Sequence, residues 1–347
     1  MARIAYVDHS YHEQTRSTLF LPELLSARGH DVDIFWDEAW RAGPSVNWES
    51  VVAYDAIVMF QSYCRTHGRS FRSLHPNVVY IPMFDQFAFS QNAPRDLTSF
   101  WEPFRGSKLL NFSTSLHALA AGIGIASHVV RYYPEVPVER PPLDGLHGFF
   151  WLRREAELGW ATVRRLIGTT RFDSFNVHVV GDPGFPPVEP PPPDDVRTHN
   201  ITVSSWFERK ADFEAVASRA NIYFAPRLEE GIGQTFLEAM ARGQCVIAAD
   251  NATMNEYIVH GVNGLVFDPR NPAPLDFADI DHLGQEARRG VIAGRARWQA
   301  AEDELVEFIL TPSAAYYGDD ISAGEPAKAS DAPRRIGPTA ALRRLRR

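Results

Sequence analysis

The sequence predicts an α/β protein built from two doubly wound domains, and three observations support this prediction. Short apolar, strand-like segments alternate with segments of helical spacing along most of the chain, which is the pattern of parallel sheets covered by helices. Residues 134–148 are rich in proline and glycine, as in a linker, and the alternation starts again after them. The length of 347 residues suits two domains of ordinary size.

The first half begins with a strand, a helix and a second strand. Residues 3–8 and 31–36 are strand-like, and leucines at helical spacing between them predict a helix over 15–28, which Gly29 ends. This order is typical of the first crossover in a parallel sheet. Further strands are expected at residues 56–60, 78–82 and 108–112, with a helix around 115–121.

The second half repeats this pattern after the linker. A glycine-rich segment precedes a predicted helix over 234–242, and Gly243 supplies its stop signal. The remaining strands are expected at residues 149–153, 176–180, 200–204 and 222–225, and the remaining helices at 155–167 and 212–219. Residues 183–195 are rich in proline and are expected to form a stiff polyproline loop.

Residues 225–269 contain the pattern most suited to ligand binding. Glu230 and Glu238 stand eight positions apart, and Gly231 and Gly233 lie between them at the start of the predicted helix. The N–H groups of a first helical turn have no partner inside the helix, so a phosphate or diphosphate is the expected guest. Carboxylates would repel a phosphate, so the glutamates are expected to accept hydrogen bonds from sugar and ribose hydroxyls. The segment therefore predicts a nucleotide-sugar site.

The same segment resembles the E-x7-E signature of retaining GT-B glycosyltransferases, especially family 4, the glycosyl transferases group 1. EGIG, LEAMA, VIAAD and EYIVHGVNGLVFDP follow one another in the family's order, and LLSARGHDVDIF resembles the opening of GT-B N-terminal domains. Residues 283–310 resemble the last two helices of the family. The resemblance implies two Rossmann-like domains facing a central cleft. The expected parts are an acceptor domain over 1–140, a donor domain over 148–295, a helix over 296–311 that returns to the N-terminal domain, and a disordered basic tail over 312–347.

The resemblance also implies roles for individual residues. Glu230 is expected to contact the donor sugar, and Glu238 the ribose. The backbone amides of residues 231–234, together with Arg153, are expected to stabilise the leaving nucleoside diphosphate. The expected nucleotide-sugar contacts are Gly231, Ile232, Gly233, Gln234, Thr235, Glu238, Arg154 and Lys210. The residues expected to act in transfer are Glu230, Arg153, Asp85 and His9.

The chain departs from the family pattern in both halves. In the family's Arg-Leu-x-x-x-Lys-Gly motif, Arg153 keeps the arginine position but Leu158 replaces the lysine. Arg154, Arg209 and Lys210 are candidates to supply the missing cation. In the first half, Asp8-His9-Ser10 replaces a glycine pair, and Phe84-Asp85-Gln86 replaces a His-Asp pair. His9 and Asp85 are expected to contact the acceptor, and helix capping is the alternative for Asp85.

Composition excludes several other classes of protein. The formal net charge of -8 argues against a general nucleic-acid binder. Two cysteines, Cys64 and Cys245, cannot form a disulfide framework, and a polar N-terminus does not read as a signal peptide. The longest apolar stretch, residues 116–130, is too short to span a membrane. These features favour a cytoplasmic protein. The arginines that close the chain either contact an anionic membrane surface weakly or form a solvated end.

The sequence therefore predicts a retaining glycosyltransferase that needs no metal and no resident cofactor. Its donor is expected to be a nucleoside-diphosphate sugar, and its acceptor a glycan, a lipid-linked glycan or a small molecule, as in polysaccharide biosynthesis. Asp279 and Asp281 lie too late in the chain to indicate a metal site. Two alternatives stay open: a GT-B nucleotide-sugar epimerase, and a module that binds a nucleotide sugar without transferring it.

Overall fold

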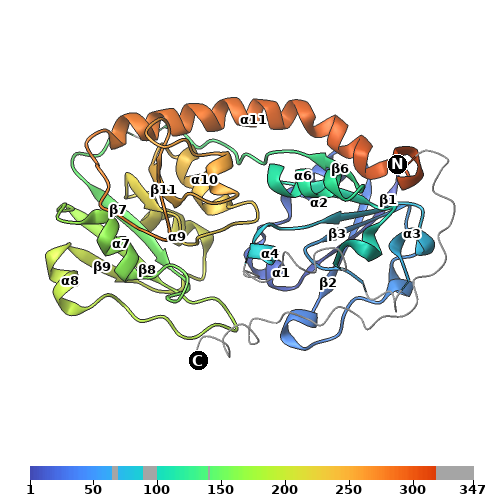
Figure 1. The fold of residues 1–347 in the computed structure, drawn as a ribbon, viewed down its shortest axis with the longest axis horizontal. Coiled ribbons are helices and arrows are strands. Elements are labelled where there is room, and N and C mark those ends of the chain that lie inside the picture. Colours follow the sequence, from blue (N-terminus) through green and yellow to red (C-terminus); the bar gives the residue numbers. More distant parts are fainter. Residues whose placement is uncertain (65–68, 89–99, 140, 318–347) are drawn as a thin grey trace. The chain divides into compact units, whose positions relative to one another are not determined.

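The computed structural model describes residues 1–64, 69–88, 100–139 and 141–317 (Figure 1). The chain divides into unit 1, Met1–Arg131 with Trp298–Arg347, and unit 2, Tyr132–Arg297. Among the described residues each unit contains one six-stranded sheet, and all neighbouring strands in both sheets run parallel. Two parallel sheets with helical connections confirm the predicted fold class.

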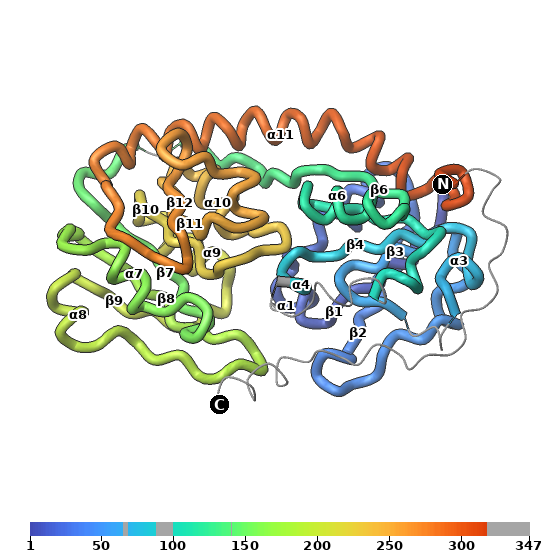
Figure 2. The backbone as a smooth tube through the Cα atoms, viewed as in Figure 1, coloured from blue at the N-terminus to red at the C-terminus, as the bar shows by residue number. Residues whose placement is uncertain are grey.

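The sheet of unit 1 has the strand order β2-β1-β3-β4-β5-β6, which can be followed in Figure 2. The order changes direction between β1 and β3, so loops that leave these two strands diverge at their carboxyl ends. Strand β6 was not predicted; it pairs with β5 through residues 126–129. The strands are β1 Arg3–His9, β2 Asp31–Asp37, β3 Ala56–Phe60, β4 Val78–Ile81, β5 Lys108–Asn111 and β6 Ala126–Val129.

The helix predicted over residues 15–28 is wrong in its first part. Arg16 adopts a left-handed conformation with φ 55° and ends a short helix, α1. The chain then starts α2 at Phe20, and Ala27 is its last residue. The helices of this unit are α1 Tyr11–Thr15, α2 Phe20–Ala27, α3 Phe71–Leu74, α4 Asp85–Ala88 and α6 Thr114–Gly122, with 3-10 turns η1 Ala39–Arg41, η2 Trp48–Ser50 and η4 Glu102–Phe104.

The sheet of unit 2 has the strand order β12-β11-β10-β7-β8-β9. Counted from β7, this is the doubly wound order 3-2-1-4-5-6 read from the other edge, and its reversal lies between β7 and β10. Ligands of such sheets bind outside the carboxyl ends of the strands at this reversal. The strands are β7 His147–Leu152, β8 Ser174–Val179, β9 Ile201–Ser204, β10 Ile222–Phe224, β11 Cys245–Ala249 and β12 Leu265–Phe267.

One helix prediction and one loop prediction in unit 2 need correction. Helix α7 begins at Trp160 rather than at residue 155, because residues 155–158 form a turn that Gly159 closes as the N-cap. The end of the proline-rich segment forms helix α8, in which Pro193 occupies the first turn, where its missing N–H costs nothing. The helices are α7 Trp160–Ile167, α8 Pro193–Thr198, α9 Lys210–Ala217 and α10 Gln234–Ala241, with the 3-10 turn η5 Met254–Glu256.

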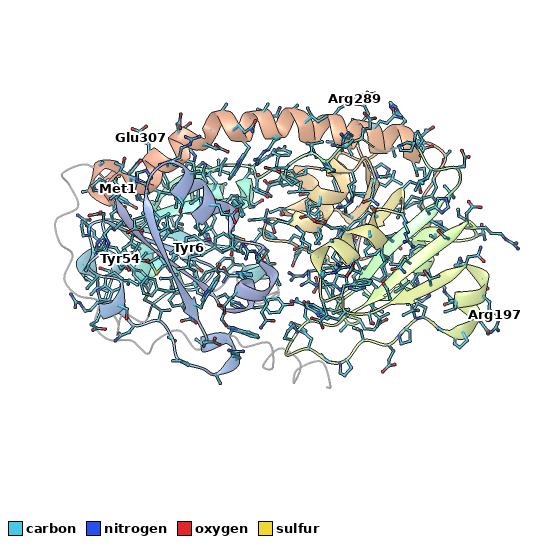
Figure 3. All side chains as sticks on the ribbon, turned by 180° about the vertical axis from the view of Figure 1, so that it is seen from behind. Met1, Tyr6, Tyr54, Arg197, Arg289 and Glu307 are labelled. Carbon is cyan, nitrogen blue, oxygen red and sulfur yellow. The ribbon has the colours of Figure 1, made fainter. Side chains whose placement is uncertain are left out.

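The final helix is continuous, although the sequence indicated two helices. Helix α11 covers Ile280–Leu310, and its residues from Trp298 onward belong to unit 1. Arg289 and Glu307 project outward from it (Figure 3). Within unit 1, the buried Lys108 ammonium donates hydrogen bonds to the carbonyls of Phe308, Ile309 and Thr311, which satisfies the end of the helix.

The first residues of the tail predicted to be disordered are ordered. Ser313–Tyr316 form the 3-10 turn η6, and the Tyr317 hydroxyl donates to the Ser107 carbonyl. The remaining tail, with its terminal arginines, lies outside the described residues. Among the helices that are described, none combines the length and the apolar character needed to cross a membrane.

Candidate functional site

The glycine loop of unit 2 lies where the fold places a ligand site. Strand β10 ends at Phe224, and the chain reaches α10 through residues 225–233. Gly233 is the N-cap of α10 with φ 74°, and a Cβ at this position would lie 1.9 Å from Cε1 of the buried Phe236. Only glycine fits there, both for its backbone and for its lack of a side chain. The loop therefore presents backbone amides at the start of a helix, as an anion site requires.

Glu230 is buried beside an arginine that sequence reasoning did not select. Arg227 is 5% exposed and Glu230 8% exposed, and their nearest charged atoms, Nη1 and Oε2, are 3.8 Å apart. The Arg227 Nε lies 3.5 Å from the Glu157 Oε1, which also accepts the Leu228 backbone N–H at 3.0 Å. The sequence did contain a signal for Arg227. It is a charged residue directly after Pro226, close to the end of the apolar strand β10.

Arg153 and Arg154 lie at the carboxyl end of β7, and both bind Asp182. The Arg153 Nε donates to Oδ1 at 2.8 Å, and the Arg154 Nε donates to Oδ2 at 2.5 Å. Burial alone would raise the pKa of Asp182, but the guanidinium groups of Arg153 and Arg154 hold this pKa below its usual value. Arg154 Nη1 also donates to Glu157 Oε2 at 3.2 Å.

These contacts form one charge chain at the reversal of the unit 2 sheet. Three arginines alternate with three carboxylates, so the formal charge of the chain is zero. Leu158, which replaces the family lysine, is 2% exposed and packs into the core. The members of the chain are Asp182, Arg153, Arg154, Glu157, Arg227 and Glu230.

Two further predicted site residues contact each other on α9 and α10. Lys210 Nζ lies 3.1 Å from Glu238 Oε1, and 3.5 Å from Glu214 Oε1. Burial would lower the pKa of Lys210, but the two carboxylates, Glu238 first, raise it. Burial also raises the pKa of Tyr223 on β10 to about 12, and Glu238 and Glu230 add to this increase, so both glutamates lie near the same strand end. Of the other predicted contacts, Thr235 faces the Tyr223 hydroxyl, while Gly231, Ile232 and Gln234 lie in the loop and first helical position.

The loop after β1 in unit 1 is built from aromatic rings rather than glycines. The His9 ring stacks on Trp40 with centroids 4.9 Å apart, and its Nδ1 accepts the Tyr11 backbone N–H at 3.3 Å. Burial, with a contribution from His12, lowers the pKa of His9 to about 4. The Trp40 Nε1 donates to the Ser10 Oγ at 2.7 Å. His9 is therefore a neutral, stacked ring at ordinary pH.

Asp85 is the first residue of the short helix α4. Its neighbour Gln86 makes the connecting hydrogen bonds of this turn. Gln86 Oε1 accepts the Met83 N–H at 2.9 Å, and Gln86 Nε2 donates to the Gln61 carbonyl at 2.9 Å. The contact of Asp85 with an acceptor stays a prediction.

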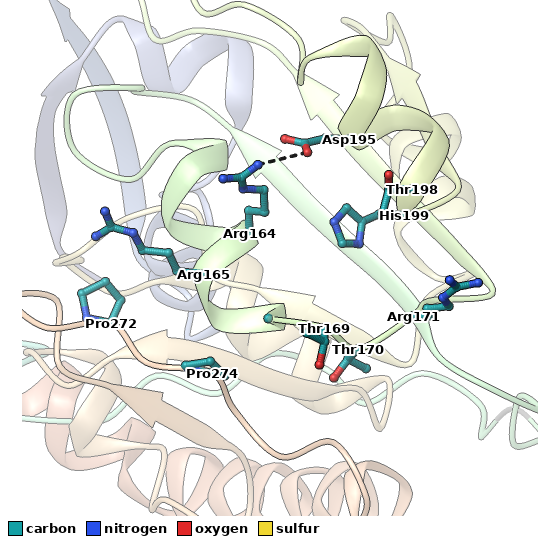
Figure 4. Close-up of a pocket in the computed structure, with 11 residues that line it drawn as sticks. Arg164, Arg165, Thr169, Thr170, Arg171, Asp195, Thr198, His199, Pro272 and Pro274 are labelled. Carbon is teal, nitrogen blue, oxygen red and sulfur yellow. Dashed lines mark hydrogen bonds and ion pairs between the residues drawn. The ribbon is translucent and has the colours of Figure 1, made fainter.

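A cavity in unit 2 is remote from these residues. It has a volume of about 660 Å³ and lies beside the residues that precede β8 and β9, such as Arg171 and His199 (Figure 4). In a parallel sheet this is the amino end, opposite to the end that carries Arg153, and ligands of doubly wound sheets bind at the carboxyl end. Arg164 on its wall pairs with Asp195 at 3.3 Å. This cavity is therefore at the opposite end of the sheet from the glycine loop. Among the residues that the structure describes, no group of three or more His, Cys, Asp or Glu side chains is placed to hold a metal ion.

Comparison with solved structures relates this fold to glycosyltransferases. Sucrose-phosphate synthase (tll1590) from Thermosynechococcus elongatus aligns with a TM-score of 0.61 at 14% identity, covering 88% of this chain and 97% of that one. A glycosyltransferase from Rickettsia africae aligns with a TM-score of 0.58 at 14% identity, covering 89% and 98%. Anabaena Alr3699/HepE in complex with UDP aligns with a TM-score of 0.57 at 14% identity, covering 87% and 99%. Its complex with UDP-glucose aligns with a TM-score of 0.54 at 15% identity, covering 88% and 99%.

The two sheets and these alignments define a GT-B fold. Residues 157–280, which include the charge chain's Glu157 and the glycine loop, match the family model of Glycosyl transferases group 1. These structures share the fold of the chain, and the family match lies within the part of unit 2 that carries the sequence motifs. A search of curated proteins gave no match.

Proposed function

We propose that this protein is a retaining glycosyltransferase that uses a nucleoside-diphosphate sugar as donor and a hydroxyl compound as acceptor. The observation that supports this most strongly is the left-handed Gly233 N-cap of α10, flanked by Glu230 and Glu238 at the reversal of the unit 2 sheet. The UDP and UDP-glucose complexes of the Anabaena protein, which shares the fold, are consistent with such a donor. The acceptor is a glycan, a lipid-linked glycan or a small molecule.

In the proposed reaction, unit 2 binds the donor and stabilises the leaving group. The amides of residues 231–234 bind the diphosphate, because the first-turn N–H groups of α10 have no partner inside the helix. Arg153, Arg154 and Arg227 supply positive charge once the diphosphate competes with the carboxylates that now hold them. Negative charge grows on the diphosphate as the sugar departs, so these donors act mainly on the transition state.

The donor site also supports two assignments that differ between the glutamates. Glu238 binds the ribose hydroxyls, and Lys210 holds its carboxylate at 3.1 Å. Glu230 lies beside the sugar, where Arg227 keeps a buried carboxylate compensated. No metal ion takes part in this mechanism, and no resident cofactor is needed. Two buried free thiols, Cys64 and Cys245, are consistent with a reducing, cytoplasmic setting.

The charge chain also favours a second candidate function, a module that binds a nucleotide sugar without transferring it. Each predicted diphosphate cation is already paired with a carboxylate, and the position of the family lysine holds the buried Leu158. Affinity for the diphosphate would then depend mostly on the loop amides. Donor binding without turnover, over a broad panel of acceptors, would establish this alternative. A GT-B epimerase would instead change the donor sugar with no acceptor present.

The test begins with calorimetry on a panel of nucleoside diphosphates and nucleotide sugars, followed by transfer assays with candidate acceptors. Glu238→Gln should weaken binding of the free nucleoside diphosphate by about 1–3 kcal/mol, the value of hydrogen bonds to a charged group. Glu230→Ala should bind that nucleotide nearly as well as the wild type but lose turnover, because contacts near the anomeric carbon strengthen in the transition state.

Glu229→Ala is the matched control, since Glu229 adjoins Glu230 but has no assigned role. Equal nucleotide affinity in Glu238→Gln and the wild type, or a wild-type transfer rate in Glu230→Ala, would contradict the assigned roles. Proton NMR of the product reports whether the anomeric configuration is retained. Turnover should survive EDTA. A loss in EDTA that manganese or magnesium restores would refute the metal-independent mechanism.

A further inference from the structure

The cavity at the amino end of the unit 2 sheet has no role in the donor chemistry. It lies between the end of α7, the end of α8 and residues 272–274, and its volume is about 660 Å³. Small-molecule sites typically have volumes of about 300–1,000 Å³. The residues that line the cavity all belong to unit 2. A ligand bound here would therefore contact one unit only and would be separate from the glycine loop.

Backbone packing fixes two walls of this cavity. The Leu275 N–H donates to the Leu166 carbonyl at 2.8 Å, which ties the proline segment to α7. Gly168 follows α7 with φ 57°, and a Cβ at this position would lie 3.0 Å from the Pro274 Cβ. The loop after α7 and the proline segment are thus in close contact. The cavity therefore exists before a ligand binds, as most small-molecule sites do.

The charged side chains around the cavity are mainly cations. Arg164, Arg165 and Arg171 line it, and Asp195 is the acidic residue among the lining side chains. Both Asp195 oxygens already accept hydrogen bonds, from Arg164 at 3.3 Å and from the Trp160 Nε1 at 2.9 Å. Within the described part of the chain, the Arg165 and Arg171 side chains form no ion pair and no hydrogen bond. Figure 4 shows these two arginines on opposite sides of the cavity, with Arg164 between them.

The helix ends beside the cavity do not cancel this positive charge. The carbonyl ends of α7 and α8 each act as about half a negative charge, and Asp195 adds one more. Three guanidinium groups exceed these two negative charges, so the local charge is about +1 in a chain whose net charge is -8. Arg171 lies beyond the last turn of α7, where a cation no longer serves the helix end. The excess charge favours an anionic ligand.

The cavity also contains polar side chains that lack partners. His199 is 6% exposed, and its buried Nδ1 makes no hydrogen bond with the residues that the structure describes. Burial lowers the pKa of His199; Asp195 opposes this effect and Arg164 adds to it. The Thr169 and Thr170 hydroxyls make no hydrogen bond with described residues either. Buried polar groups normally have partners, so a ligand in the cavity would complete the hydrogen bonding.

We propose that this cavity is a second ligand site, which binds a small molecule through its phosphate group. Guanidinium groups bind phosphate through charge-assisted hydrogen bonds, and threonine hydroxyls are further donors to its oxygens. The cavity is larger than a phosphate ion, so the remaining volume accommodates the rest of the molecule. Binding at this site does not require glycosyl transfer, and it is tested without a transfer assay.

NMR of the His199 imidazole tests the site while inorganic phosphate is added to the full-length protein at constant ionic strength. Phosphate should move the His199 signal with saturation and raise the pKa of His199, because a nearby negative charge favours the protonated ring. The exposed His282 on α11 serves as the reference signal. The double variant Arg165→Gln/Arg171→Gln should bind phosphate about tenfold more weakly or worse, since hydrogen bonds to a charged group are lost. Arg219→Gln, at an exposed position of unit 2, should bind it as the wild type does.

Vesicle flotation distinguishes a soluble phosphate compound from a lipid headgroup. Vesicles of phosphatidylcholine with phosphatidic acid are compared with vesicles of phosphatidylcholine alone, for the wild type and the double variant. Binding to phosphatidic acid that the double variant loses would support the site and identify a headgroup as its ligand. Saturable binding of inorganic phosphate without this vesicle binding would support the site and identify a soluble ligand.

Two results would overturn the second site. One is the absence of any saturable movement of the His199 signal, together with equal vesicle binding by the wild type and the double variant. The other is equal phosphate affinity in the double variant and Arg219→Gln. Arg165 and Arg171 are exposed, so both substitutions should leave the melting temperature near that of the wild type; if the double variant melts early, Arg171→Gln replaces it. Failure of the transfer assays would refute the proposed function and leave this site standing.

Discussion

The two sheets place their candidate sites at equivalent positions but build them from different chemistry. At the reversal between β7 and β10, unit 2 has a glycine loop, a helix start and a chain of paired charges. At the reversal between β1 and β3, unit 1 has stacked rings and the buried carboxylate of Asp8, with the buried Asp37 at the end of the adjacent β2. The first arrangement suits an anionic ligand, because backbone amides and arginines bind phosphate. The second arrangement presents aromatic faces and buried carboxylates instead.

The two candidate sites also differ in the contacts that their side chains make when no ligand is bound. In unit 2 the arginines are paired with Asp182, Glu157 and Glu230, so the proposed diphosphate would have to displace these carboxylates. In unit 1 burial lowers the pKa of His9 to about 4, and the His12 Nδ1 lies 2.8 Å from the Asp8 Oδ1. Unit 2 is therefore expected to respond to changes of charge, and unit 1 to changes of hydrogen bonding.

The largest expected effect comes from removing Arg227, the cation of unit 2 closest to Glu230. Arg227→Met leaves Glu157 and Glu230 buried with less compensation, and breaking a buried ion pair costs about 3–5 kcal/mol. Urea unfolding should show this loss of stability, and nucleoside diphosphate binding should weaken as well. Arg219→Met, at an exposed position of the same unit, should change stability by less than about 0.5 kcal/mol. Equal stabilities for the two variants would show that the charge chain does not stabilise unit 2.

Unit 2 could be predicted further from sequence than unit 1, for a physical reason. A glycine loop at a helix start is a local feature, so residues 230–243 alone indicated the loop, α10 and its end at Gly243. The charge chain is not local. It joins residues from three loops, and the pairing of Arg153 and Arg154 with Asp182 requires the parallel pairing of β7 with β8.

In unit 1 the prediction failed where one local conformation decided the outcome. Helical spacing predicted a single helix over residues 15–28. The left-handed Arg16 ends α1 instead, and α1 places His12 one helical turn after Asp8. The continuous α11 was similarly missed, because Gly290 and Gly294 lower helical propensity without ending the helix.

A second, smaller effect tests whether the unit 2 site depends on its backbone. Gly233→Ala should lose about 1–2 kcal/mol for its left-handed conformation, and about 1–3 kcal/mol more because the new Cβ overpacks against Phe236. Gly261 has a similar φ of 69° with open space around it, so Gly261→Ala should show the first loss only. Urea unfolding measures both variants. Nucleotide binding should fail in Gly233→Ala and persist in Gly261→Ala, and equal behaviour of the two would contradict a backbone anion site at Gly233.

The smallest expected effect concerns a property that the two units share, a histidine whose pKa burial lowers to about 4. Burial lowers the pKa of His178 on β8 to about 4, as it does for His9, and the His178 ring stacks on Phe207 with centroids 5.3 Å apart. Below the ordinary pKa of 6.5 these histidines bind protons in the unfolded chain, whereas in the folded chain they bind them only near pH 4. The contribution of these neutral histidines to the free energy of unfolding is therefore fully present above about pH 6.5 and is lost as the pH decreases toward 4. His178→Phe keeps the stacking but cannot titrate, so its unfolding free energy should fall less steeply over this range, and His9 should account for part of the remaining slope. His282→Asn, at an exposed position of α11, should keep the wild-type slope. If the unfolding free energy of His178→Phe kept the wild-type pH dependence, water would reach the His178 imidazole in the folded protein. The pKa of His178 would then not be lowered by burial, in contrast to that of His9 in unit 1.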